Sequence, residues 1–78
     1  MNKAEEITLQ RRIDNFNARV QANLNIGIID EQSLKQRIKL NEEREKFKIL
    51  LIMYFPKENI SKIESMLVKI TKIKSKHL

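Results

Sequence analysis

Side chains that could catalyse a reaction or bind a metal are few in this sequence. The only histidine, His77, stands next to the C-terminus, and the chain has no cysteine. A zinc site needs several such ligands, and no other histidine is present to activate a nucleophile. The acidic pairs at 5–6 and 42–43 have basic neighbours and are typical of a solvated helix face rather than an acid/base pair. We therefore expect no enzyme, no metal or other cofactor and no small-molecule substrate.

Lysines toward the C-terminal end are the first candidates for a binding role. Residues 57–78 carry six Lys and two Glu, whereas residues 1–56 carry ten basic and eight acidic side chains, and the net charge is +6. On a helix, four of these lysines would share one face: Lys62, Lys69, Lys72 and Lys76. Such a face could follow a nucleic-acid backbone or bind an acidic partner. It could equally be a solvated face that aids solubility.

Two other interpretations of this end stay open. A helix-turn-helix across residues 53–67 has tolerable apolar spacing, but its turn would contain a proline and its second helix no arginine. A basic amphipathic helix could also lie on an anionic membrane, although the chain has no Trp and its apolar stripe is needed in the core.

The segment FKILLIMYF, residues 47–55, is the second candidate. Eight of its nine residues are apolar, so a helix through it has no polar face and needs cover all round. A buried strand is the alternative, but nothing else in the chain could pair with it. A chain of 78 residues builds only a small core, so we expect a second copy or another protein to supply part of the cover. The predicted interface consists of Phe47, Leu50, Leu51, Tyr54 and Phe55, with Ile63 and Leu67.

We expect helices to position both candidate binding segments, because a chain with one glycine and one proline has few places where a helix would be interrupted. A helix over residues 3–26 is predicted by an apolar stripe with spacings of four, three, four and four: Leu9, Ile13, Phe16, Val20 and Leu24. Gly27 is well placed as the residue just past the end of this helix. Asp30 can cap a second helix by accepting from the amides of Gln32 or Ser33.

The second helix is predicted over residues 31–54. Two helices of similar length joined by a short turn favour an antiparallel hairpin. We expect its seam to pair Phe16 with Ile38 and Leu9 with Phe47. The polar run at 41–46 would then place its glutamates opposite the arginines at 11 and 12.

A third helix is predicted over residues 57–75. Pro56 pushes the residue before it out of helical geometry and is acceptable in the first turn of a new helix. A start at Ser61 is the alternative, because Ser61 and Glu64 have the spacing of a capping box. Apolar residues at 60, 63, 67 and 70 form the stripe of this helix.

The stretch ANLNIGIIDEQSLKQR, residues 22–37, resembles a short cytoplasmic hairpin in the flagellar and type III export-gate family. The matching positions are Ala22, Leu24, Asn25, Gly27, Ile29, Asp30, Glu31 and Arg37. The resemblance covers 16 of 78 residues, includes none of that family's membrane helices, and implies a helical hairpin but no function. In size and shape the chain also resembles the small hairpin co-chaperones of type III secretion.

These patterns predict an all-α fold, with a long antiparallel hairpin and a C-terminal helix in one domain of residues 1–78, assembled as a homodimeric or larger bundle. We expect a non-catalytic protein–protein interaction module, with nucleic-acid binding through the C-terminal lysines as the alternative. Acids stand where a signal peptide would be apolar, and the longest apolar run, at 49–55, is far shorter than the roughly 20 residues of a membrane span. We therefore expect a cytoplasmic protein with no membrane span.

Overall fold

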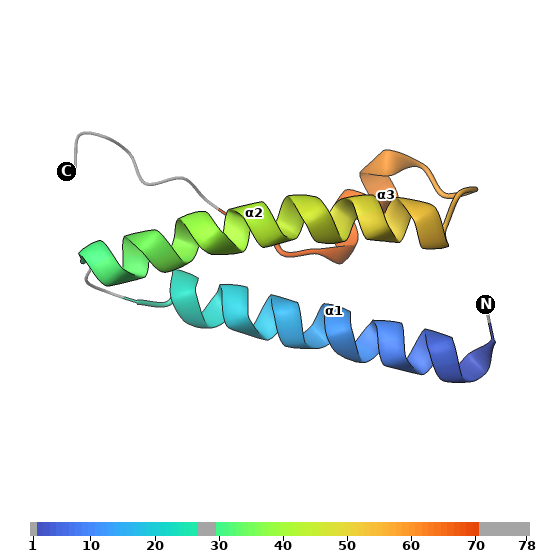
Figure 1. Ribbon diagram of the computed structural model, residues 1–78, viewed down its shortest axis with the longest axis horizontal. Coiled ribbons are helices and arrows are strands. Elements are labelled where there is room, and N and C mark those ends of the chain that lie inside the picture. The colour runs from blue at the N-terminus through green and yellow to red at the C-terminus, as the bar shows by residue number, and fades with distance from the viewer. Residues whose placement is uncertain (1, 27–29, 71–78) are drawn as a thin grey trace.

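The computed structural model describes residues 2–26 and 30–70, and these residues form three helices and no strand. Helix α1 spans Lys3–Leu24, α2 spans Glu31–Tyr54 and α3 spans Ile60–Met66. Figure 1 shows α1 and α2 running antiparallel, with α3 beside the C-terminal half of α2. The fold is all-α, as the sequence predicts. No described helix has both the length and the apolar character needed to cross a membrane.

Helix α1 begins with a cap that the sequence analysis did not identify. The Asn2 side chain accepts a hydrogen bond from the Glu5 amide at 2.8 Å, and Glu5 and Glu6 place negative charge in the first turn. The helix ends at Leu24 with Asn25 as its C-cap, two residues before the predicted end at 26. Gly27 lies outside the described residues, so its role in the turn stays a prediction.

Helix α2 occupies the range expected from the sequence and begins at the predicted cap. The Asp30 carboxylate accepts from the Ser33 amide at 2.8 Å, and the Ser33 hydroxyl accepts from the Asp30 amide at 3.0 Å. These two hydrogen bonds form a capping box and satisfy two amides that the first turn leaves without helical partners. The bond from the Ser33 amide is the largest cause that lowers the pKa of the Asp30 carboxyl, and the Ser33 side chain is the second.

The face that α2 turns toward α1 differs from the predicted one. The buried residues of α2 are Ser33, Arg37, Leu40 and Leu51, whereas Ile38 is 54% exposed. Phe16 packs edge-on against Phe47 at 5.8 Å between ring centroids instead of against Ile38. The predicted pairing of Phe16 with Ile38 is therefore wrong, because two polar residues, Ser33 and Arg37, occupy the buried positions near the start of α2.

Helix α3 is much shorter than predicted. It begins after Asn59, whose side chain accepts from the Lys62 amide at 2.8 Å, and Pro56 lies in the preceding turn. Both proposed starts, at Pro56 and at Ser61, are therefore wrong. The helix ends at Met66, and Leu67 has an extended backbone with φ −110° and ψ 133°.

The residues after α3, 67–70, are here named the C-terminal strap. Asn17 of α1 ties the strap to the hairpin: its side-chain amide donates to the Met66 carbonyl at 3.0 Å, and its side-chain oxygen accepts from the Val68 amide at 2.9 Å. Leu67 and Ile70 are both buried. Because α1 binds these backbone groups, they do not join a helical ladder, and the predicted helix over 57–75 stops early.

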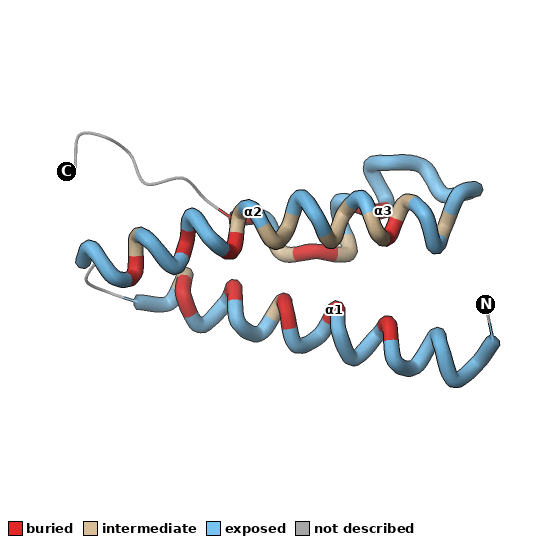
Figure 2. The backbone as a smooth tube through the Cα atoms, viewed as in Figure 1, coloured by how far each residue is buried: buried red, intermediate tan, exposed pale blue. Residues whose placement is uncertain are grey.

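The core lies along the seam of the hairpin and continues under α3 and the strap. Figure 2 shows the buried positions on the facing sides of α1 and α2. The buried apolar residues are Leu9, Ile13, Phe16 and Val20 of α1, Leu40 and Leu51 of α2, Ile63 of α3, and Leu67 and Ile70 of the strap.

Candidate interaction surface

Three of the seven predicted interface residues lie in the core instead of at the surface. Leu51 and Ile63 are 0% exposed and Leu67 is 2% exposed. They belong to the cluster that joins α2, α3 and the strap, so in this conformation they are not available to a partner. The prediction is corrected for these residues, because α3 and the strap already cover that side of α2.

The other predicted interface residues are at least partly accessible. Phe47, Leu50 and Phe55 are half-buried, and Tyr54 is 43% exposed. Two apolar residues of the same helix that the sequence analysis did not select are more exposed still: Ile49 at 59% and Met53 at 73%. Ile49 and Met53 are four residues apart and therefore neighbours on one helix face. Ile49, Met53 and Tyr54 are here named the apolar ridge.

A second surface feature is a groove between α1 and α2. Two hollows of about 250 Å³ and about 490 Å³ adjoin, and Arg12 lines both of them. The described residues that line them all come from α1, its cap and α2, with none from α3 or the strap. The larger hollow has an apolar floor of Phe16, Phe47 and Leu50 and a rim that contains Arg12, Arg19 and Lys46; these six residues are here named the basic groove.

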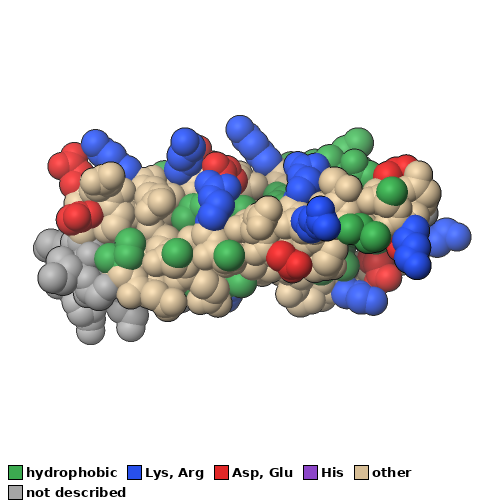
Figure 3. All heavy atoms as spheres, turned by 90° about the horizontal axis from the view of Figure 1, so that it is seen from below, with side chains coloured by type: hydrophobic (Ala, Val, Ile, Leu, Met, Phe, Trp, Pro, Cys, Tyr) green, Lys and Arg blue, Asp and Glu red, His purple; other side chains and the backbone are tan. Residues whose placement is uncertain are grey.

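The charges of the basic groove are only partly neutralised. Arg19 pairs with Glu43 at 3.0 Å, and the Arg12 guanidinium lies 5.4 Å from the centroid of the Phe47 ring. Within residues 2–26 and 30–70, neither Arg12 nor Lys46 forms an ion pair. Figure 3 shows Lys and Arg side chains gathered mainly over one long half of the hairpin face.

Among the described residues, the predicted lysine face is interrupted between Lys62 and Lys69. Lys62 lies on α3 and pairs with Glu58 at 3.4 Å. Lys69 lies in the strap, beyond the end of α3, so the two lysines do not share a helix face. Lys72 and Lys76 lie outside the described residues.

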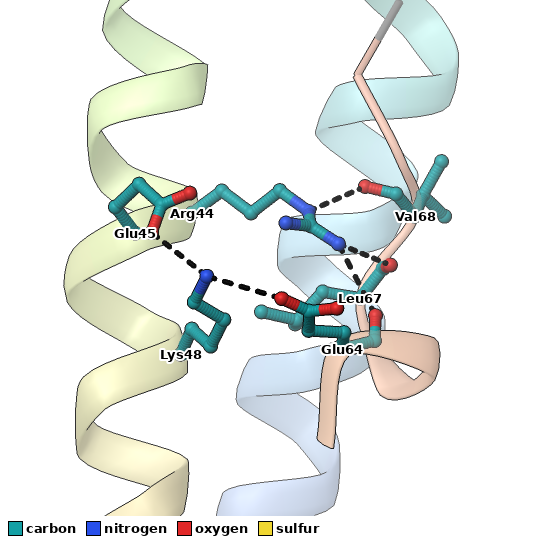
Figure 4. Close-up of polar contacts among 6 residues, drawn as sticks. All are labelled: Arg44, Glu45, Lys48, Glu64, Leu67 and Val68. Atoms are coloured by element: carbon teal, nitrogen blue, oxygen red, sulfur yellow. Dashed lines mark hydrogen bonds and ion pairs between the residues drawn. The ribbon is translucent and has the colours of Figure 1, made fainter. Parts of the chain in front are cut away.

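Among the described residues, the glutamates of the polar run at 41–46 form no ion pair with Arg11 or Arg12, and Glu43 pairs with Arg19 instead. The arginine of this run reaches to the end of α3: Arg44 donates to the carbonyls of Val68 at 3.0 Å, Glu64 at 3.1 Å and Leu67 at 3.3 Å (Figure 4). Nearby, Lys48 contacts Glu45 at 3.0 Å and Glu64 at 3.3 Å (Figure 4). Hydrogen bonds to Glu45 and Glu64 raise the pKa of Lys48 above its ordinary value.

Polar side chains also bridge the other end of the hairpin. Arg37, buried at 9% exposure, donates to the Asn23 side-chain oxygen at 2.8 Å and to the Asn23 carbonyl at 3.3 Å. The Asn23 side-chain amide donates to the Ser33 carbonyl at 3.2 Å and to Gln36 at 3.1 Å. In the described ranges, every buried side-chain nitrogen and oxygen of a non-exposed residue has a hydrogen-bond partner. The bridge is therefore a satisfied structural element and not an empty ligand site.

The acidic side chains do not gather into a metal site. The described part of the chain contains no group of three or more His, Cys, Asp or Glu residues that could hold a metal ion.

Comparisons with protein-family models, with curated proteins and with solved structures gave no match to this chain.

Proposed function

We propose that this chain is a small non-catalytic interaction protein that binds a protein partner through the apolar ridge. The main observation that supports this proposal is the exposure of Met53 at 73% and of Ile49 at 59%, in a helix segment whose opposite face is buried in the core. Contiguous exposed apolar side chains typically mark a binding surface in a water-soluble protein. Methionine adapts its shape to different partners and is common at such surfaces.

The occupant that we propose is a second copy of the chain. Two ridges related by a two-fold axis would bury the same side chains on both copies, which is the usual geometry of a homodimer. The small core supports this choice, because small domains commonly gain stability by association. A homodimer or larger bundle is also what the apolar segment at 47–55 predicts.

Nucleic-acid binding through the lysines is the less supported function. Lys62 is already paired with Glu58, and Lys69 does not continue a helix face with it. The positive charge of the chain favours an acidic partner, but the positions of Lys62 and Lys69 add no specific geometry for nucleic acid.

The test is to disrupt the ridge and measure self-association. Met53→Glu places a charge where the dimer would bury an apolar side chain, and desolvating an unpaired charge opposes association. We expect the wild-type chain to sediment as a dimer, and the Met53→Glu variant as a monomer, at micromolar to millimolar concentration. Ile38→Glu is the matched control, because Ile38 is 54% exposed on the same helix but outside the ridge; this variant should remain a dimer.

Two results would contradict the proposal. One is a wild-type chain that stays monomeric over the whole concentration range. The other is equal loss of association in the Met53→Glu and Ile38→Glu variants, which would show that added charge, and not the ridge, controls assembly. Circular dichroism of both variants checks that the helices are retained.

A further inference from the structure

We infer that the basic groove binds an acidic amphipathic helix of a partner protein. The groove is defined by Arg12, Arg19 and Lys46 on its rim and by Phe16, Phe47 and Leu50 on its floor. Ile49 and Met53 of the ridge line neither hollow, and Tyr54 lines only the adjoining smaller one. The inference therefore goes beyond the proposed function and does not depend on it.

The shape of the groove fits a helix. The antiparallel helices α1 and α2 form its walls. None of the described residues that line it belongs to α3 or the strap. The lining residues of α1 run from Ala4 in the smaller hollow to Arg19 in the larger one. These two positions lie about 22 Å apart along the helix at 1.5 Å per residue, which matches about four turns of a bound helix. A helix placed there would complete a layer of three packed helices, a common way to cover an open hairpin.

The floor selects an apolar side on that helix. Phe47 and Leu50 are half-buried, and Phe16 is held edge-on to Phe47 at 5.8 Å. Apolar side chains at three- and four-residue spacing on the partner could therefore remove the accessible parts of Phe47 and Leu50 from water.

The rim selects negative charge on the flanks of that helix. The ion pair between Arg19 and Glu43 neutralises the one acidic side chain of the larger hollow. Arg12 and Lys46 have no acidic partner within the described residues. Contact with Phe47 holds the Arg12 guanidinium over the groove, so less side-chain entropy is lost when it binds a carboxylate.

The same geometry disfavours single-stranded nucleic acid. Base stacking needs a free aromatic face, but the Phe47 ring has the Arg12 guanidinium 5.4 Å above it and the Phe16 ring packed against it at 85°. Phe16 itself is only 5% exposed.

The experiment uses the full chain and a synthetic helical peptide of about 18 residues, long enough for about five turns. The Leu/Glu peptide carries leucine at three- and four-residue spacing and glutamate on its flanks. A Leu/Gln peptide removes the charge, and an Ala/Glu peptide removes the apolar side. By fluorescence anisotropy we expect binding of the Leu/Glu peptide alone, and weaker binding as salt rises toward about 0.5 M.

Variants locate the binding to the groove. Lys46→Glu reverses an exposed rim charge and should weaken binding of the Leu/Glu peptide about tenfold or more. Lys57→Glu is the matched control, because it makes the same charge change at an exposed residue outside the groove; its effect should stay below about threefold. Met53→Glu should leave peptide affinity unchanged, which separates this site from the ridge.

Four outcomes would overturn the inference. They are no binding of the Leu/Glu peptide at millimolar concentration, equal binding of either control peptide, equal weakening by Lys46→Glu and Lys57→Glu, and displacement of the peptide by an oligothymidylate whose own binding is lost in Lys46→Glu. The last result would assign the groove to nucleic acid. Amide chemical shifts of Arg12 and Leu50 that move with the Leu/Glu peptide would support the groove directly.

Discussion

Arg37 and Arg44 stand seven residues apart on α2, and each donates hydrogen bonds to the end of another helix. Arg37 reaches the Asn23 carbonyl near the end of α1, and Arg44 reaches three carbonyls at and beyond the end of α3. Neither α1 nor α3 has a basic residue in its own last turn. The arginines therefore add hydrogen bonds to carbonyls at or just beyond the ends of these helices and place positive charge at the negative end of each helix dipole.

Removing the donors of Arg44 should release the strap. Arg44→Met keeps an unbranched stem but leaves three carbonyls without this partner, and we expect a loss of about 1–3 kcal/mol in the free energy of unfolding. Hydrogen exchange at the Val68 amide, which donates to Asn17, should become faster. Urea unfolding followed by circular dichroism measures the first effect and NMR the second.

Arg11→Met is the matched control for this prediction, because Arg11 is an exposed arginine of α1. Its stability should change by less than about 0.5 kcal/mol. If Arg44→Met behaved like Arg11→Met, the contacts of Arg44 with the strap would have no energetic role.

At the scale of the element, each helix begins at a local cap. Asn2, Asp30 and Asn59 each accept a hydrogen bond from the backbone amide three residues later. Helix α3 has only seven residues, fewer than the roughly 12–15 at which an isolated helix becomes even marginally stable. Its cap alone cannot hold it, so the buried side chains of Ile63 and Leu67 must contribute.

The cap of α2 predicts a pH dependence of stability. Hydrogen bonds from Ser33 lower the pKa of Asp30 in the folded chain, so the unfolded chain binds a proton at this carboxylate more readily. The stabilisation is therefore complete above the unfolded pKa and is lost as the pH falls through the lower folded value, below about pH 4.

Asp30→Asn tests this dependence, because asparagine keeps an accepting oxygen but does not titrate. Urea unfolding at pH 7 and pH 3 should show a larger loss of stability for the wild-type chain than for the variant on acidification. Parallel losses in both proteins would show that the charge of Asp30 does not contribute.

At the scale of the whole molecule, the described residues cover the hairpin on one side only. Helix α3 and the strap pack against α2 and α1 through Ile63, Leu67 and Ile70. The other side keeps the basic groove, and the outer face of α2 keeps the apolar ridge. This asymmetry separates a stabilising side from a side with two candidate binding surfaces.

Substitution of Leu51 tests whether the helices and the strap are stabilised by one shared core. It is 0% exposed among residues of α1, α3 and the strap, and Leu51→Ala should cost about 2–5 kcal/mol. A chain of 78 residues is typically stable by about 4–12 kcal/mol in total. We therefore expect a much lower urea midpoint, with α3 and the hairpin losing structure together.

Leu50→Ala is the matched control, because it removes the same atoms from the next residue of α2, which is only half-buried. Its cost should be clearly smaller. Equal destabilisation by the two substitutions would contradict the placement of Leu51 at the centre of the core.

The sequence by itself determined the all-α class, the two long helices and the cap at Asp30. These features follow from local signals: apolar spacing along α1 and a capping residue at the start of α2 act within a few neighbouring residues. The sequence also predicted that a single copy of the chain cannot bury all the apolar side chains of residues 47–55. Ile49 and Met53 became identifiable only when Leu51 was seen to face the core.

Only the tertiary structure decided where α3 ends, which face of α2 is buried, and that Lys62 and Lys69 do not share a helix face. The contacts responsible join residues far apart in sequence, such as Asn17 with Val68 and Arg44 with Leu67. Local periodicity favours a helix through residues 67–70, but side chains of α1 and α2 bind the backbone there and Leu67 and Ile70 are buried in the seam. A pattern of neighbouring residues cannot report a backbone hydrogen bond that another helix supplies.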